Sequence, residues 1–215
     1  MQVHISDMSG KLDGFKAINT NTLSNKFCQK VSQASDDSII CTKCYSVTML
    51  ESFRKNCVEP FQRNSDLLSK YELTAEQIPI FKDAFVRFSG HGELINYLHL
   101  HNLVLIAGSN PRTRFGLWTK RKELVYNYFN ENSFHRLDNT KPLNLVIIYS
   151  NPRIGTILDK PPNQYFDKTF NNVAENEFVE QQNCTGQQCK NCLLCYRDND
   201  VTTIIEKVKF YGKKK

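Results

Sequence analysis

The chain has 215 residues, 40% of them hydrophobic and 11% aromatic, and its formal net charge is +6. This is enough apolar sequence to bury the core of one large domain. Residues 1 to 14 show no basic-then-apolar signal pattern, and no apolar run is long enough to span a bilayer. We therefore expect a soluble, cytoplasmic protein with no membrane partner.

The N-terminal part mixes short elements with loops. Residues 3 to 27 predict short strands and turns, with Gly10 and Gly14 as breakers, and the polar stretch from 28 to 41 predicts a loop. Residues 45 to 70 predict a helix that Pro60 kinks or divides. Its apolar residues recur at a spacing of four, at Met49, Phe53, Cys57 and Phe61.

The rest of the chain alternates strands and helices. Strands are predicted at 84–88, 103–107, 115–119, 144–149 and 202–210, and helices from Glu93 to about 101 and at 122–130. This rhythm predicts an α/β fold with a parallel sheet, whose ligands bind at the carboxyl ends of the strands. We expect residues 1–180 to form the α/β domain and residues 181–215 a cysteine-rich, cluster-binding segment with a terminal strand.

All eight cysteines fall into two groups, separated by a long stretch that has none. In a reducing compartment such clusters bind metal or do redox work, and rarely form structural disulfides. The strongest signal is Cys184-x4-Cys189-x2-Cys192-x2-Cys195, because thiolates favour iron–sulfur clusters and zinc. Its repeated x2 spacing favours a [4Fe–4S] cluster. Zinc stays the alternative, since it more often joins two separated Cys-x2-Cys pairs.

The N-terminal group predicts a second centre. Cys41-x2-Cys44 precedes a predicted helix, whose amino end favours thiolates, and Cys28 can fold back as a third ligand. Cys57 lies in the apolar stripe of that helix, so we interpret it as a buried helix thiol. Three protein thiolates would leave one iron of a cluster open to an outside ligand.

The turn from Arg87 to Glu93 is the candidate ligand site. Glycines at the end of a strand let backbone N–H groups approach a ligand, so Gly92 and Glu93 are candidates to hold a small molecule. Arg87 or Lys120 would neutralise its carboxylate. The alternative is a purely structural strand-to-helix turn, in which Glu93 stabilises the first helical turn.

Basic residues permit an anionic partner. They form the tail 213–215 and a stretch with aromatic neighbours, at Arg112, Arg114, Lys120, Arg121 and Lys122. Together with the Cys-x2-Cys pairs, they support a second hypothesis, a zinc-stabilised module that binds nucleic acid. A third hypothesis is that the metal is structural and that the protein acts through a protein partner.

Several of these motifs resemble known families. Cys41-Thr42-Lys43-Cys44-Tyr45 resembles the closing half of the cluster loop of radical S-adenosylmethionine enzymes, and residues 87–93 resemble their glycine–glutamate motif, which binds the methionine amino group. Further motifs lie at residues 19–22 and 115–120 and at the closing cysteines before Tyr196. With all of these motifs, the chain is similar to the phage and bacterial "gene product eighty-eight" domain family, from about residue 19 to residue 210.

The resemblance implies a partial (β/α) barrel and a bacteriophage protein that works in the host cytoplasm. The anionic partner that the basic residues permit would then be nucleic acid or a host protein. The resemblance also implies radical-enzyme-like chemistry on an unknown substrate, with S-adenosylmethionine held at Gly92 and Glu93. The chain departs from the radical-enzyme loop at Cys28. Twelve residues separate Cys28 from Cys41, where the usual loop has three.

Overall fold

The strands form one open sheet in chain order. The protein is described by a computed structural model that covers residues 2–130 and 140–208. The order is β1 (Ser6–Asp7), β2 (Lys16–Ile18), β3 (Phe85–Phe88), β4 (Arg114–Thr119), β5 (Leu145–Ile154), β6 (Lys168–Val173) and β7 (Thr203–Lys207). β1 runs antiparallel to β2, and every other neighbouring pair is parallel. The predicted α/β class is confirmed, and the sheet does not close because β1 and β7 are not neighbours.

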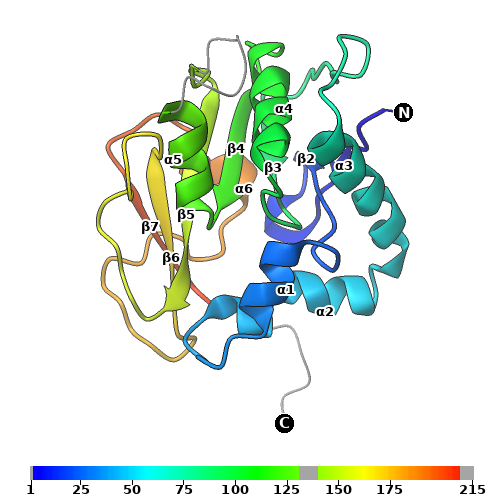
Figure 1. Cartoon of the computed structure of the whole chain (residues 1–215). Helices are drawn as coiled ribbons and strands as arrows, with labels where there is room; N and C mark the ends of the chain where they lie inside the picture. Colours follow the sequence, from blue (N-terminus) through cyan, green and yellow to red (C-terminus); the bar gives the residue numbers. More distant parts are fainter. Residues whose placement is uncertain (1, 131–139, 209–215) are drawn as a thin grey trace.

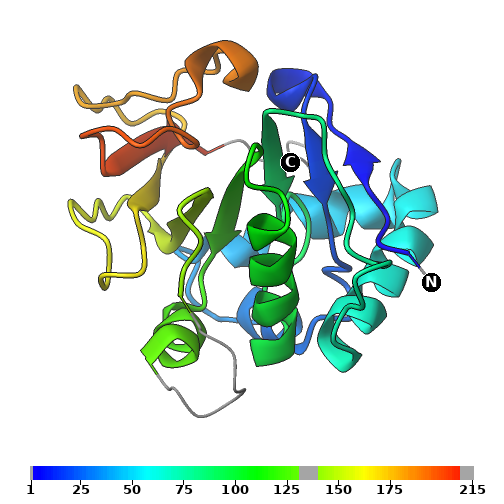
Figure 2. The same ribbon diagram turned by 90° about the horizontal axis from the view of Figure 1, so that it is seen from above.

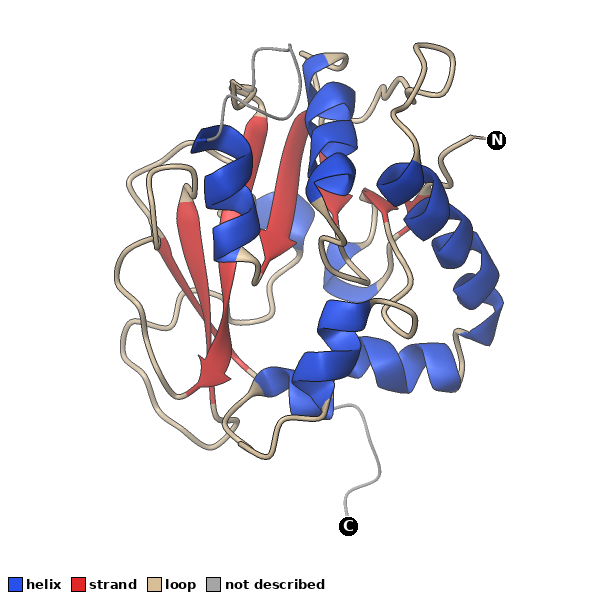
Figure 3. Ribbon diagram, viewed as in Figure 1, coloured by secondary structure: helices blue, strands red, loops and turns tan. Residues whose placement is uncertain are grey.

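The helices divide between the two faces and one end of this sheet (Figures 1 and 3). α3 (Val58–Lys70), α4 (Tyr97–Gly108) and α5 (Lys122–Asn130) cover one face. α1 (Lys26–Ser32) and α2 (Tyr45–Glu51) lie beyond the carboxyl ends of the strands. On the opposite face the 3-10 helix η1 (Gly10–Leu12) lies beside α6 (Cys189–Cys192), as Figure 2 shows. Two more 3-10 helices are η2 (Ile40–Lys43) and η3 (Lys55–Cys57).

The main core lies between the sheet and α4, and it corrects one prediction. Residues 103–107 were expected to form a strand, but they lie inside α4, which begins at Tyr97 and not at Glu93. Asn96 caps this helix by accepting a hydrogen bond from His99 N at 2.9 Å. A short apolar run has no period that separates a buried strand from a helix buried on most sides. The apolar side chains of α4 pack against the sheet residues Val86, Phe88, Phe115 and Leu117.

The N-terminal helices also differ from the prediction. The helix predicted over residues 45–70 is interrupted between α2 and η3, at residues 52–54, and not at Pro60. Pro60 sits in the first turn of α3, where no helical partner awaits its missing N–H. Cys28 was expected in a loop but lies in α1, because the Asn25 side chain accepts from the N–H groups of Phe27 and Cys28 and so starts a helix there.

Other elements agree closely with the sequence. The strand near 84–88, the strand at 115–119 and the helix at 122–130 are confirmed as β3, β4 and α5, while β6 was not predicted. β7 confirms the terminal strand over 203–207; residues 209 and 210 of that prediction, like the lysines 213–215, lie outside the described residues. None of the described helices is both long and apolar enough to cross a bilayer.

Acid should destabilise the fold through His99, which is buried on α4. Its Nδ1 accepts from Ile95 N at 3.2 Å. Burial, and then the charge of Arg121, lowers the His99 pKa from 6.5 to about 3. Between these two values the unfolded chain binds a proton that the folded chain does not. This group leaves the free energy of unfolding unchanged above pH 6.5 and lowers it by up to about 1.4 kcal/mol for each pH unit below that value.

Urea unfolding of the wild type and of His99→Asn, at about pH 7 and about pH 5, measures this effect. Asparagine keeps an acceptor for the Ile95 N–H but does not titrate. We expect the variant to be less stable than the wild type at the higher pH and to lose less stability on acidification. Equal losses in the two proteins would show that His99 does not set the acid sensitivity.

Candidate functional site

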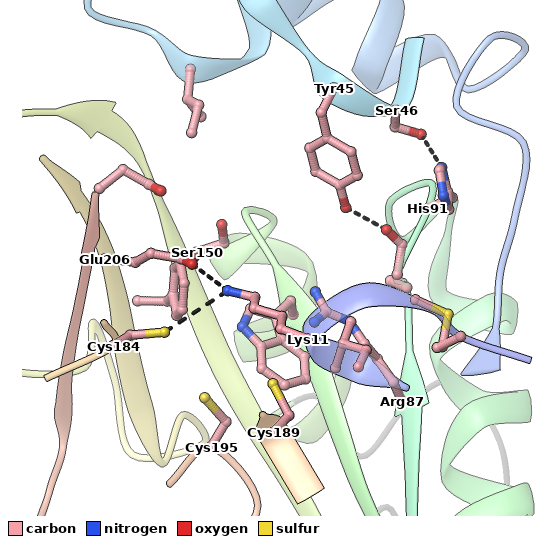
Figure 4. A pocket seen from close by; sticks show the side chains of 18 of the residues that line it. Lys11, Tyr45, Ser46, Arg87, His91, Ser150, Cys184, Cys189, Cys195 and Glu206 are labelled. Atoms are coloured by element: carbon pink, nitrogen blue, oxygen red, sulfur yellow. Dashed lines mark hydrogen bonds and ion pairs between the residues drawn. The ribbon is translucent and has the colours of Figure 1, made fainter. Parts of the chain in front are cut away.

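A cavity of about 600 Å³ lies at the carboxyl ends of the strands and over the face of the sheet that α6 and η1 cover. Seven of the eight cysteines line it, and Cys57 does not. The seven are the N-terminal thiols Cys28, Cys41 and Cys44 and the C-terminal thiols Cys184, Cys189, Cys192 and Cys195. The fold therefore brings the two predicted ligand groups to one space, although they are far apart in the sequence. Figure 4 shows Cys184, Cys189 and Cys195 on one side of this cavity.

The three N-terminal thiols come from three consecutive elements. Cys28 lies on α1, Cys41 on η2, and Cys44 is the residue before α2. Burial raises the pKa of Cys28, and the nearby charges of Glu93 and Cys44 raise it further. Burial also raises the pKa of Cys41, against the opposing effect of the Lys120 cation. The charges of Glu93 and Lys120 thus both act on Cys28 and Cys41, and Cys44 lies near both of these thiols.

The four C-terminal thiols are held by β7 and α6. Cys184 N donates to Ile205 O at 3.1 Å, and Cys184 forms an isolated parallel bridge with Glu206. Cys189 and Cys192 are the first and last residues of α6. Burial, followed by the charges of the other three thiols, raises the pKa of Cys195 to about 12. A metal cation would have to displace a proton from this thiol.

Contacts from the N-terminal hairpin hold the C-terminal group in place. Lys11, on η1, bonds to the Glu206 carboxylate, and its Nζ lies 3.8 Å from Cys184 Sγ (Figure 4). The Tyr196 ring packs against Phe15, with ring centroids 5.0 Å apart. Neither Lys11 nor Glu206 was predicted as a site residue, because their roles depend on two segments that only the fold brings together.

Gly116 makes room for Tyr196 on the sheet. A Cβ at Gly116 would lie 2.9 Å from Tyr196 Cε1 and 2.8 Å from Trp118 Cζ3, closer than side chains tolerate. Gly116 is therefore the position in β4 against which the cysteine-rich segment packs. A glycine in an apolar strand is the one sequence signal for this contact.

The turn from Ser89 to Glu93 is tied to the chain by internal hydrogen bonds. The Glu93 carboxylate accepts from Leu94 N at 2.8 Å, from the Thr119 hydroxyl at 2.5 Å and from Lys120 N at 2.8 Å. It thus links the ends of β3 and β4. The structural alternative expected Glu93 to stabilise the first turn of a helix. However, α4 begins only at Tyr97, so Glu93 does not lie in a helical turn.

The His91 side chain belongs to a buried polar chain. Its Nδ1 lies 2.7 Å from Ser46 Oγ, which lies 2.5 Å from Thr22 Oγ1. Burial, and then the charges of Arg54 and Arg87, lowers the pKa of His91 to about 4, so the imidazole is neutral near pH 7. Ser46 was not predicted as a site residue, and Thr22 entered only through the resemblance of residues 19–22. Together they fix the ring beside the cavity.

The predicted ligand-binding residues Arg87, Gly92, Glu93 and Lys120 all line the cavity. Lys120 Nζ lies 3.2 Å from Ser150 Oγ. Burial would lower the pKa of Lys120, but the nearby Cys41 and Glu93 outweigh it and raise the value. Lys120 acts on the N-terminal thiols, whereas the charge of Arg87 acts on Cys189 and Cys195.

The thiols surround a space and not a point. Within residues 2–130 and 140–208, no three or more His, Cys, Asp or Glu side chains are grouped so as to hold a single metal ion. A zinc ion requires its ligands to meet at one point, about 2.0–2.3 Å from the metal. In a [4Fe–4S] cluster each thiolate binds a different iron of a larger core. The donors fit a cluster in kind and number, but no closed coordination geometry is formed.

Comparisons of the chain with known protein families, with curated proteins and with solved structures find no match. The interpretation of the site therefore rests on its own chemistry.

Proposed function

We propose that this protein is an iron–sulfur protein of phage type whose two thiol groups hold [4Fe–4S] clusters on either side of one substrate cavity. The observation that carries the proposal is the meeting of seven cysteines from both ends of the chain at a single cavity, which Cys57 does not share. Cytoplasmic thiols gathered in this way serve metal or redox chemistry. Four ligands would belong to the C-terminal centre and three to the N-terminal centre.

The N-terminal centre would be the reactive one, because three thiolates leave one iron open. The sheet supports this assignment: its parallel strands follow one another in chain order without closing, as in a partial (β/α) barrel. In such folds the loops after the strands carry the chemistry, and α1, η2 and the turn after β3 supply such loops here. A bound cluster would supply electron transfer, and the chain would hold and orient the substrate.

A finer proposal is that S-adenosylmethionine is the co-substrate, as in the radical enzymes that the motifs resemble. A carboxylate offers about four acceptor positions, and Glu93 uses three of them within the chain. One position is left for an amino group. Calorimetry with S-adenosylmethionine on the metal-loaded protein tests this step, and binding that Glu93→Gln leaves unchanged would exclude Glu93 from it.

Metal analysis tests the proposal as a whole. We expect protein that is purified and reconstituted without oxygen to be brown, to absorb near 400 nm, and to contain iron and acid-labile sulfide in equal amounts. Stoichiometric zinc without sulfide would instead support a zinc-stabilised module. In that case, salt-sensitive binding of oligonucleotides would point to nucleic acid as the partner. A colourless, metal-free product would exclude both metal assignments.

A further inference from the structure

Arg87 brings into the cavity a cation that no carboxylate of the described residues neutralises. Its guanidinium lies over the Trp118 ring, 4.0 Å from the ring centroid, and its buried Nε has no hydrogen-bond partner within residues 2–130 and 140–208. None of the ion pairs among the described residues includes Arg87. A partly buried charge is costly unless a partner offsets its lost hydration. The stacked guanidinium is therefore arranged for a partner from outside the chain.

Arg54 is a second cation of this kind at the same cavity. Its Nη2 donates to Ser9 Oγ at 2.8 Å, and no described ion pair includes it. Both arginines lower the pKa of His91, so their fields overlap at one place. Gly90 lies beside Arg87, since a Cβ there would be in ordinary contact with Arg87 Nε, at 3.7 Å.

The carboxylates that line the cavity do not balance these charges. Among the described residues they are Glu93 and Glu206. Glu93 is held by the three donors described above, and Glu206 bonds to Lys11. The positive charge at Arg87 and Arg54 is therefore balanced by no carboxylate of the described residues. The Cys189 and Cys195 thiols, whose deprotonation the charge of Arg87 favours, would become anions near Arg87 only on binding metal.

We infer that Arg87 and Arg54 form an oxyanion subsite, which binds the carboxylate or phosphate group of a small-molecule substrate. A guanidinium presents parallel N–H donors that match both groups, and the Trp118 face holds the Arg87 fork in one plane before the ligand arrives. The inference rests on the proposed function only in taking this cavity as the functional one. It does not depend on which metal the thiols hold.

The single tryptophan makes this subsite directly observable. Trp118 is the only tryptophan in the chain and touches Arg87, so its fluorescence should report an anion bound there. Metal-loaded protein, prepared without oxygen, is titrated with inorganic phosphate and separately with malonate, at an ionic strength held constant with potassium chloride. We expect a saturable change in emission with at least one probe, and a matching dissociation constant from calorimetry.

Three variants and a matched control assign the binding to the arginines. Arg87→Met should weaken binding by about tenfold or more, because a charge-assisted pair is lost. Arg87→Lys keeps the charge without the fork and should weaken binding less, and Arg54→Met should also weaken it. The control is Arg153→Met, since Arg153 pairs with Asp36 at 3.0 Å and does not line the cavity. This control should bind like the wild type.

The outcomes are distinct. Binding of phosphate alone assigns a phosphate ester, and binding of malonate alone assigns a carboxylate. The inference is overturned if neither probe binds the wild type, or if Arg87→Met binds as tightly as the wild type. Circular dichroism checks the fold of each variant. If Arg87→Met does not fold, unchanged affinity in both Arg87→Lys and Arg54→Met overturns the inference instead. Metal content is measured on the same samples, so metal-free protein that still binds the probe contradicts only the proposed clusters.

Discussion

Replacing Cys189 and Cys192 together with serine should remove about half of the iron and acid-labile sulfide from protein made without oxygen. Replacing Cys41 and Cys44 together should remove the other half. Each change takes two soft ligands from one of the two centres, and a serine hydroxyl is a poor substitute for a thiolate. Iron and sulfide analysis, with the absorbance near 400 nm, measures both losses.

Cys57→Ser is the matched control for these variants. Cys57 ends η3, is half-buried and donates weakly to the neighbouring Asn56 side chain at 3.7 Å, away from the cavity. It is thus less buried than the helix thiol that the apolar stripe predicted. We expect the control to keep the full iron content. If the iron content falls only when one of the two cysteine groups is changed, the protein has a single centre. If the iron content falls equally in all three variants, the assignment of the ligands is contradicted.

Gly92→Ala should be the most destabilising single substitution near the site. Gly92 has a φ of +84°, which alanine rarely adopts. A Cβ there would lie 2.1 Å from Thr20 Oγ1 and 2.6 Å from the Thr20 carbonyl oxygen. This backbone cannot easily withdraw, because Thr20 N donates to His91 O at 3.2 Å. We expect the free energy of unfolding to fall by about 3 kcal/mol or more, measured by urea unfolding.

Gly108→Ala provides the comparison. Gly108 is the last residue of α4, and its φ is not in the left-handed region. A Cβ there would meet no atom of the described residues within 4 Å. Alanine favours a helix and reduces the freedom of the unfolded chain. We expect stability to be unchanged or raised by up to about 1 kcal/mol. Similar losses at the two positions would mean that the crowding around Thr20 does not govern the turn.

The prediction of the fold succeeded where the local pattern was distinctive. Residues 122–130 have the period of an amphipathic helix, and 115–119 are bounded by charged residues on both sides, so α5 and β4 were found at nearly their true limits. It failed at 103–107, since a run that is apolar throughout has no period to separate a strand from a helix. There the capping bond of Asn96 and the packing against the sheet decide for a helix.

The candidate site divides in the same way. The sequence identified the cysteines as two groups and Arg87, Gly92, Glu93 and Lys120 as ligand candidates, because residue type and spacing carry that chemistry. It contained no sign that all of these residues line one cavity, nor that Arg87 pairs with no carboxylate in the part of the chain that the structure describes.

Residue type and spacing along the chain specify two clusters of soft thiol ligands, and an α/β alternation that places glycine-containing turns after strands. Which of these residues meet depends on the folded arrangement of the strands. Strand pairing brings β7 and its bridged Cys184 to the same sheet as the N-terminal hairpin, and Lys11 and Tyr196 join the two ends. Such contacts depend on distance in space, and spacing along the chain specifies that distance only within a single local element.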